Sequence, residues 1–221
     1  MSDSSDSVRA LARHPRVFVH DHPLLHHKLS VLRTPETDSP TFRARLGEVA
    51  GLMVWAATRD LPTREVEVRT PLETTTGRVL ASPVTVVPVL RAGLGMSEGV
   101  MHVFPEARIG HLGMARDEET LQPRTYLKRL PDDLHAGPVL LVDPMLATGG
   151  SAAAAVKVLR DAGAESLRFV GLVGAPEGVR ALLEADRYIT IHLAAIDRQL
   201  DHRGFILPGL GDAGDRAFGT V

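Results

Sequence analysis

The sequence predicts an α/β protein with a mostly parallel, five-stranded sheet flanked by helices. Short apolar runs alternate with helical patterns through the second half of the chain, an order typical of parallel sheets covered on both faces. The clearest unit begins with the apolar run 139–142, passes through a small-residue turn and continues into an Ala-rich helix at 152–160. Open sheets of this class bind ligands where their strands end, so we expect a site at the carboxyl end of that strand.

Length, charge and composition narrow the class of protein. The 221 residues suit one domain with a sizeable core, and we expect a disordered segment at 1–16 followed by a single domain at 17–221. A net charge of −2 argues against nucleic acid or a membrane surface as a partner. There is no cysteine, which excludes disulfides and thiol catalysis, and no apolar run resembles a membrane span or a signal peptide. These features favour a cytoplasmic enzyme.

The first part of the chain carries three recognisable elements. Residues 17–19 have the composition of a short strand. Apolar residues spaced three and four apart predict a helix at 42–59, with Thr41 as its N-cap. Alternating residues at 65–69 predict an exposed strand of a hairpin or flap, whose turn we place at 74–77.

Four histidines gather near the start of the domain, at positions 20, 22, 26 and 27. No Glu or Cys completes a recognisable metal-ligand spacing around them. We therefore expect surface or interface roles for these imidazoles rather than a metal site.

A buried strand at 84–90 leads into the run Arg91-Ala92-Gly93-Leu94-Gly95. Together with Gly99 this run reads GxGxxxG, which is one residue longer than the dinucleotide-binding fingerprint. We favour a different anion site, formed by Arg91 and the neighbouring backbone amides. A further strand at 109–114 leads into a polar loop that contains Arg116.

The strongest functional pattern follows the strand at 139–142. Asp143 stands where the strand ends, and the turn Ala147-Thr148-Gly149-Gly150-Ser151 leads into the helix. Backbone N–H groups of such a turn, next to the positive end of a helix dipole, favour a phosphate. The glycines permit close approach, and the two hydroxyls add donors. A carboxylate near an anion site suits sugar hydroxyls or bound Mg²⁺, so the pattern predicts a phosphorylated sugar as ligand.

Strands at 167–173 and 188–196, separated by a helix at 179–185, complete the alternating order. The tail at 204–220 is rich in glycine, and the stretch at 209–214 has the spelling GxGxxG. Only seven residues follow Gly214, too few for the helix and second strand of a dinucleotide-binding unit. Apolar residues such as Phe205 and Leu210 predict instead a folded loop over the active site.

These segments together resemble the type I phosphoribosyltransferases, and among them the uracil phosphoribosyltransferase family. The stretch 143–151 is similar to the motif that binds 5-phosphoribosyl-1-diphosphate (PRPP), in the variant with Asp-Pro instead of two adjacent acids. The stretch 87–96 resembles the pyrophosphate loop of the uracil enzymes, and the tail at 204–220 resembles their C-terminal hood. The resemblance covers roughly residues 17–221.

The resemblance implies a type I phosphoribosyltransferase fold with a β-arm and a hood formed mainly by residues 197–221. It implies that uracil and PRPP react to UMP and diphosphate, with Mg²⁺ bound mainly through PRPP rather than by a direct protein ligand. Relatives form homodimers or larger assemblies and some respond to GTP. We therefore expect a homo-oligomer with GTP as an effector.

The resemblance also implies roles for single residues. The implied catalytic residues are Asp143, Arg116 and Asp212. The implied PRPP-binding residues are Arg91, Arg116, Asp143, Pro144, Met145, Leu146, Ala147, Thr148, Gly149, Gly150, Ser151 and Asp212. The implied uracil-binding residues are Ile206, Gly211, Asp212 and Ala213. The chain departs from the family pattern at Asp201-His202-Arg203 and at Phe205, which are not base-contacting positions in the family.

Two alternatives share this fold. An RNA-binding regulator that senses uridine nucleotides would show a basic face, which the net charge of −2 does not favour. An enzyme for a purine or orotate would differ in the hood and would usually carry the paired acids. A kinase is excluded because the sequence contains no GxxxxGK[ST] motif.

Overall fold

The computed structural model describes residues 2–116 and 123–220, which fold around one central sheet. Along its main path the strand order is β1-β11-β10-β8-β4-β6-β7, and the short strands β5 and β9 pair with β4 and β10. The strands are β1 (Val17–Val19), β4 (Thr85–Leu90), β5 (Arg108–Ile109), β6 (His111–Arg116), β7 (Pro123–Arg129), β8 (Val139–Val142), β9 (Met145–Leu146), β10 (Leu167–Gly174) and β11 (Thr190–Ile196).

The predicted mostly parallel sheet is confirmed. Strands β11, β10, β8, β4 and β6 run parallel and form the five-stranded centre. The structure adds β1, which pairs in parallel with β11, and β7, which pairs antiparallel with β6. The backbone of β7 pairs with β6 as far as Arg129, so the chain after the polar loop returns to the edge of the sheet.

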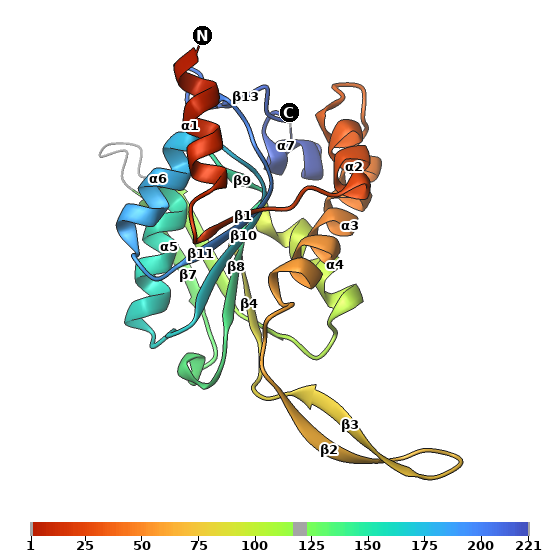
Figure 1. Ribbon diagram of the computed structural model, residues 1–221. Helices are drawn as coiled ribbons and strands as arrows, with labels where there is room; N and C mark the ends of the chain where they lie inside the picture. The colour runs from red at the N-terminus through yellow and green to blue at the C-terminus, as the bar shows by residue number, and fades with distance from the viewer. Residues whose placement is uncertain (1, 117–122, 221) are drawn as a thin grey trace.

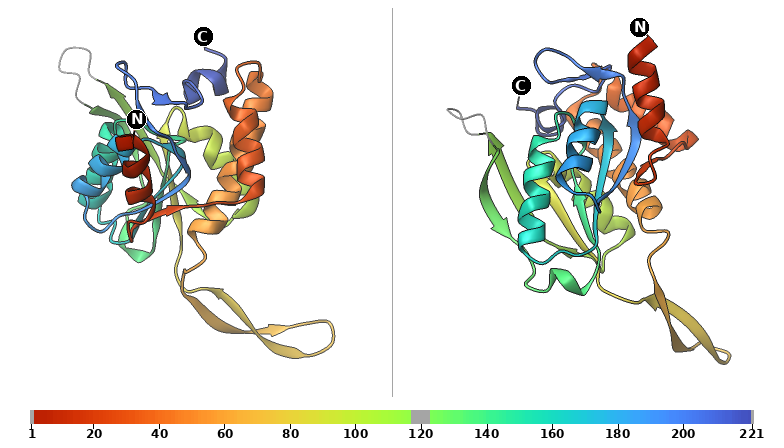
Figure 2. Two further views of the ribbon diagram at one scale, coloured as in Figure 1. Left: turned by 45° about the horizontal axis from the view of Figure 1, so that its top comes forward. Right: turned by 60° about the vertical axis from the view of Figure 1, so that its left-hand side comes forward.

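Helices cover both faces of the sheet (Figures 1 and 2). One face carries α1 (Ser2–Ala12), α5 (Gly150–Asp161) and α6 (Pro176–Ala185), and the other carries α2 (Pro23–Arg33), α3 (Ser39–Ala57), α4 (Gly93–Val103) and α7 (Ala213–Phe218). A short 3-10 helix occupies Leu134–Ala136. Side chains of β8 alternate between the two resulting cores: Leu140 and Val142 face one, while Val139 and Leu141 face the other. No helix in the described ranges has the length and apolarity needed to cross a bilayer.

Two expectations for the helices were wrong. Residues 1–16 were expected to be disordered, but α1 forms there and buries Leu11 in the core on the α5 and α6 face. The N-cap of α3 is Asp38, not Thr41, because the Asp38 carboxylate accepts the Thr41 backbone N–H at 2.8 Å. The helix therefore begins one turn earlier than its apolar pattern indicates, with Pro40 in the first turn.

The strands β2 (Thr63–Arg69) and β3 (Thr74–Leu80) form a hairpin that projects from the body, and we call this hairpin the arm (Figure 1). Its turn lies at 70–73, not at 74–77 as expected, since Thr74 to Gly77 pair with β2. The Thr70 hydroxyl accepts the N–H groups of Leu72 and Glu73, and Pro71 sits at a favoured turn position.

Candidate functional site

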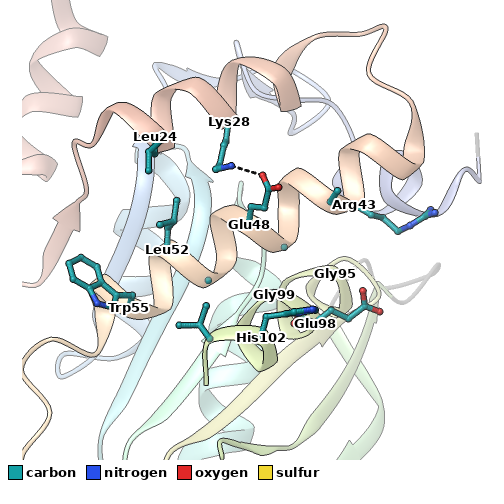
Figure 3. Close-up of a pocket in the computed structure, with 14 residues that line it drawn as sticks. Leu24, Lys28, Arg43, Glu48, Leu52, Trp55, Gly95, Glu98, Gly99 and His102 are labelled. Atoms are coloured by element: carbon teal, nitrogen blue, oxygen red, sulfur yellow. Dashed lines mark hydrogen bonds and ion pairs between the residues drawn. The ribbon is translucent and has the colours of Figure 1, made fainter. Parts of the chain in front are cut away.

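Two cavities bear on function, and they differ in chemistry. The larger has a volume of about 830 Å³ and lies between α2, α3 and α4 (Figure 3). Its lining is mainly apolar, with Trp55 70% exposed and Leu24 50% exposed, and its charged groups include the Lys28–Glu48 ion pair. We call this cavity the apolar groove. It contains none of the residues predicted to bind the substrates.

The smaller cavity lies where β8 and β9 end, below the C-terminal tail, and has a volume of about 410 Å³. Most of the predicted site residues line it: Asp143, Met145, Leu146, Ala147, Thr148, Gly149, Ser151, Ile206, Gly211, Asp212 and Ala213. The structure therefore brings the central motif and the tail together, although more than fifty residues separate them in the chain. We refer to this cavity as the substrate pocket.

The turn at 147–151, called the phosphate loop below, is built from backbone geometry. Gly149 has φ +82°, which side-chain-bearing residues rarely adopt, and a Cβ on it would lie 2.8 Å from the Gly178 carbonyl oxygen. Gly178, near the start of α6, packs closely against the loop, since a Cβ on Gly178 would lie 2.3 Å from the Ala147 carbonyl oxygen. The loop is thus held tightly against α6.

The phosphate loop places helix α5 with its N-terminus at the pocket. The first N–H groups of a helix have no partner within the helix and carry the positive end of its dipole. The Thr148 hydroxyl accepts the Gly150 N–H at 3.4 Å, and Thr148 itself is exposed. The loop therefore has the backbone arrangement expected of an anion site.

Asp143 is held at the end of β8. Its backbone N–H donates to the Val170 carbonyl, and its carboxylate accepts the Met145 N–H at 3.3 Å. Burial disfavours the charged form and raises the pKa of Asp143 to about 7; the Met145 N–H opposes this shift and the negative charge of Asp212 adds to it. The sequence contained no sign of this perturbation, because it arises from the pocket walls.

Asp212 is the N-cap of α7. Its carboxylate accepts the Asp215 N–H at 2.9 Å, and it lies near enough to Asp143 to disfavour ionisation there. Asp212 therefore has a structural role beside the substrate role that the resemblance implies.

The hood, residues 197–220 as described, consists of the hairpin β12 (Gln199–Leu200) and β13 (Ile206–Leu207), a glycine-rich turn and α7. Buried Asp197 anchors its start: both carboxylate oxygens accept from Arg33, at 2.7 and 2.8 Å. Arg33 also donates to the Gly209 carbonyl at 2.7 Å, and the Gly209 N–H donates to Asp197 at 2.8 Å. This network closes the hood onto α2.

Two further arginines fasten the end of the hood. Arg216 donates to the carbonyls of Leu32, Leu210 and Thr34, and its guanidinium lies 4.5 Å from the centre of the Phe42 ring. Arg43 donates to the Ala217 carbonyl at 2.7 Å. The end of the hood is therefore held by two cations that do not line the pocket.

Some predicted site residues do not line the pocket. Gly150 belongs to the phosphate loop and Pro144 follows Asp143, but neither lines the pocket. The exposed Arg91 forms an ion pair with Asp215 at 3.3 Å. Arg116 ends β6, and its side chain lies outside the described part of the structure.

Several lining residues were not predicted: Ala92, Ala152, Arg203, Gly204, Phe205 and Gly214. Arg203 and Phe205 are departures from the family pattern that we expected to lie away from the base contacts. Both nevertheless line the pocket, because the β12–β13 turn folds back over the phosphate loop. The sequence offered one signal for this turn: Gly204, a residue suited to a turn, follows the cation Arg203.

In the described ranges no cluster of three or more His, Asp or Glu side chains could hold a metal ion. The histidines near the start have structural contacts: His22 caps α2 by accepting the Leu24 N–H, and His20 lies 3.1 Å from His192. In the pocket, Asp143 and Asp212 offer hard oxygen donors, which fit a Mg²⁺ whose other ligands come from a substrate phosphate and water.

Comparisons with known proteins agree with this geometry. A family model described as uracil phosphoribosyltransferase matches residues 19–220. A uracil phosphoribosyltransferase from Ligilactobacillus salivarius is 52% identical over 201 residues, covering 90% of this chain and 96% of the relative. One from Streptococcus pneumoniae is 50% identical over 206 residues, covering 93% and 99%. The solved structure of the AQ2163 protein from Aquifex aeolicus is similar with a TM-score of 0.87 and 36% identity, covering 91% of this chain and 97% of that one.

Proposed function

The chain belongs to the uracil phosphoribosyltransferase family, and we propose that it converts uracil and PRPP to UMP and diphosphate in pyrimidine salvage. The observation that carries the proposal is the substrate pocket, which joins an anion-binding loop, a half-buried acid and a backbone-rich hood in one cavity. These three parts of the pocket match three groups of the substrates: the phosphate and the ribose of PRPP, and the base.

The phosphate loop is proposed to bind the 5′-phosphate of PRPP through its backbone N–H groups and the hydroxyls of Thr148 and Ser151. Pro144, Met145, Leu146 and the loop residues would shape this end of the pocket. Asp143 is proposed to accept hydrogen bonds from the ribose hydroxyls, which it does most strongly in its ionised form. Asp212 would face the ribose from the hood side.

The proposed reaction is a displacement at C1 of the ribose. The bond from C1 to the diphosphate oxygen breaks with its electron pair leaving on the diphosphate, a bond from C1 to N1 of uracil forms, and the N1 proton is released to solvent. Arg91 and Arg116 are proposed to bind the departing diphosphate, for which Arg91 would exchange its exposed contact with Asp215 for the substrate. Mg²⁺, bound mainly through PRPP, would supply neutralisation of charge on that diphosphate. Holding both reactants in line removes much of the entropic barrier.

The hood is proposed to read the base. Uracil presents two carbonyls with an N3–H between them, a pattern that backbone N–H and C=O groups of Ile206, Gly211 and Ala213 can match. Cytosine reverses the donor and acceptor roles at two of these positions and would leave buried groups without partners, which costs about 1–3 kcal/mol per group. The hood thus favours uracil over cytosine.

The test is an assay of product formation from PRPP and Mg²⁺ with uracil, cytosine, orotate, hypoxanthine or adenine supplied separately. We expect UMP from uracil and no nucleotide from the other bases. Nucleotide product from another base instead would contradict the proposal that the hood selects uracil. No product from any base, together with a gel shift of a pyrimidine-operon transcript, would favour the RNA-binding alternative.

We also propose a homodimer, for which two surfaces of the chain are the support. The arm projects without packing on its own body and exposes Leu72 (95%), Val68 (39%) and Val79 (41%). An isolated two-stranded hairpin is marginal in water, so a second copy is the proposed support for the arm. The same copy is proposed to cover the apolar groove and the exposed Trp55 (Figure 3).

The assembly is tested by sedimentation of the wild type, Trp55→Glu and Lys157→Ala. The groove variant should sediment as a monomer, and the control variant, changed in an exposed charge of α5 away from the groove and the arm, should not. A wild type that sediments as a monomer would contradict the proposal.

GTP is proposed as an effector on the strength of the family resemblance, and its addition to the uracil assay should change the rate. The proposed location is the cytoplasm, because PRPP is a polyanion that does not cross membranes unaided.

A further inference from the structure

The substrate pocket carries more negative than positive side chains. Its charged lining residues in the described structure are the acids Asp143 and Asp212 and the cation Arg203. A phosphoribosyl substrate brings several further negative charges, and a helix N-terminus offers only about half a positive charge. Arg203 is therefore the side chain within the lining that can balance a phosphate.

The backbone around Arg203 is held in a fixed turn. The Asp201 carboxylate accepts the N–H groups of Arg203 and Phe205, both at 2.8 Å. The Asp201 carbonyl accepts the Gly204 N–H at 3.0 Å, and Gly204 has φ +85°. A turn with this many internal hydrogen bonds presents its side chains from a preorganised position.

The guanidinium of Arg203 is not committed to an acid. It lies 5.0 Å from the centre of the Phe205 ring, and no carboxylate of the described residues lies within 4.0 Å of it. Arg91 differs, because it is paired with Asp215. The aromatic contact restrains Arg203 while leaving its N–H donors available to a ligand.

The turn lies over the phosphate loop. A Cβ built on Gly204 would be in ordinary contact, 3.6 Å, with a methyl carbon of Thr148, and Arg203 lines the same pocket as Thr148, Gly149 and Ser151. This places the turn at the loop end of the pocket. A guanidinium fork matches two phosphate oxygens, so a phosphate on the loop suits it.

We propose that Arg203 binds the 5′-phosphate of the phosphoribosyl substrate from the hood side, opposite the phosphate loop. The proposal deepens the proposed function and rests on it. It makes Arg203 a binding residue that links the hood to the phosphate site.

The test compares dissociation constants of UMP, ribose 5-phosphate and inorganic diphosphate for the wild type and Arg203→Ala. UMP and ribose 5-phosphate carry the 5′-phosphate, whereas diphosphate represents the leaving group. We expect about tenfold weaker binding of the first two ligands and unchanged binding of diphosphate. The KM for PRPP should rise by a similar factor with kcat nearly unchanged.

Two matched variants separate charge from structure. Arg203→Lys keeps the charge and should recover part of the affinity, and His202→Ala, the exposed neighbour in the same turn, should behave as the wild type. Unchanged UMP binding in Arg203→Ala would overturn the proposal, as would a larger loss for diphosphate than for ribose 5-phosphate. If the wild type formed no UMP, the proposed function would fail, while ribose 5-phosphate binding would still report on Arg203.

Discussion

The phosphate loop and the hood form opposite walls of one pocket, yet they are specified in different ways. The loop is local: strand, acid, turn and helix follow one another within residues 139–161. The hood depends on distant partners, since Arg33 reaches Asp197 across 164 positions and Arg43 reaches Ala217 across 174. The comparison teaches that one wall is encoded by a contiguous motif, and the other by long-range hydrogen bonds.

The largest expected effect concerns the acid at the loop. Asp143→Asn removes the charge that accepts ribose hydroxyls, so turnover should fall by about 100-fold or more, equivalent to about 3 kcal/mol in the barrier. Uracil binding on the hood should be retained. The measurement is kcat and KM for both substrates, with Asp161→Asn in an exposed ion pair as control. Equal loss of uracil binding would show that the two walls are not separable.

The same variant has an opposite effect on stability. The raised pKa of about 7 means that ionising Asp143 opposes folding: its contribution to stability is fully present below the unfolded pKa of 3.8 and is lost as pH rises through 7. Asp143→Asn should therefore keep or raise Tm at pH 8. In the wild type, kcat/KM for PRPP should fall as pH drops below about 7, because a protonated Asp143 is a weaker acceptor for the ribose hydroxyls than the carboxylate. A pH profile that stays flat in the wild type would remove Asp143 from the mechanism.

A break in the hood anchor should have the next largest effect. Arg33→Met leaves the buried Asp197 carboxylate, 8% exposed, without its cation, which should cost about 3 kcal/mol of stability. The KM for uracil should rise by a larger factor than the dissociation constant of ribose 5-phosphate. The reason is that the hydrogen bonds of Arg33 in the described structure reach Asp197 and Gly209, not the phosphate loop. Arg45→Ala, which breaks an exposed pair with Glu48, is the control and should cost under about 1 kcal/mol. Chemical denaturation measures the stability of both variants, and substrate kinetics measures their KM for uracil.

This contrast explains what could be predicted from the sequence. Strand 139–142, Asp143 and the loop were predictable because each signal lies within a few residues of the next. The Arg33–Asp197 contact and the tuned pKa of Asp143 were not, because both depend on which segments meet in space. The N-cap at Asp38 and the turn at 70–73 were misplaced for a milder reason: several neighbouring residues had suitable chemistry, and only backbone geometry selects one.

The glycine at the start of α5 allows a sharper test of the local wall. Gly149→Ala combines a positive φ with a Cβ that would approach Gly178 and Ala181 to 2.8 and 2.9 Å, so we expect about 2 kcal/mol of destabilisation and weaker ribose 5-phosphate binding. Gly163→Ala is the matched control, since its φ is +93° but nothing lies within 4 Å of the added Cβ. Gly163→Ala should lower the free energy of unfolding only by the cost of a positive φ for a residue with a Cβ, about 1 kcal/mol. Equal losses in both would contradict the packing argument.

The smallest expected effect concerns β11, the strand from which the hood continues. His192 is buried at 5% exposure, stacks on Phe18, and has His20, Arg168 and Asp60 as its charged or titratable neighbours. Burial, with smaller contributions from His20 and Arg168, lowers its pKa to about 3, so the folded protein leaves it neutral.

Because the unfolded chain binds a proton near pH 6.5, the stability contributed by neutral His192 is present above that value and is lost as pH falls towards 3. The loss at pH 5.5 should be about 1 kcal/mol from this side chain. His192→Phe should remove that part of the acid sensitivity in denaturation experiments at pH 7.5 and 5.5, whereas His135→Ala on the surface should not. His192 does not line the substrate pocket, so its protonation should lower stability without a direct effect on either ligand. Ribose 5-phosphate affinity should fall at higher pH than stability does, because Asp143 on the loop side protonates near pH 7. Acid sensitivity of the stability that is unchanged in His192→Phe would contradict the burial argument for β11.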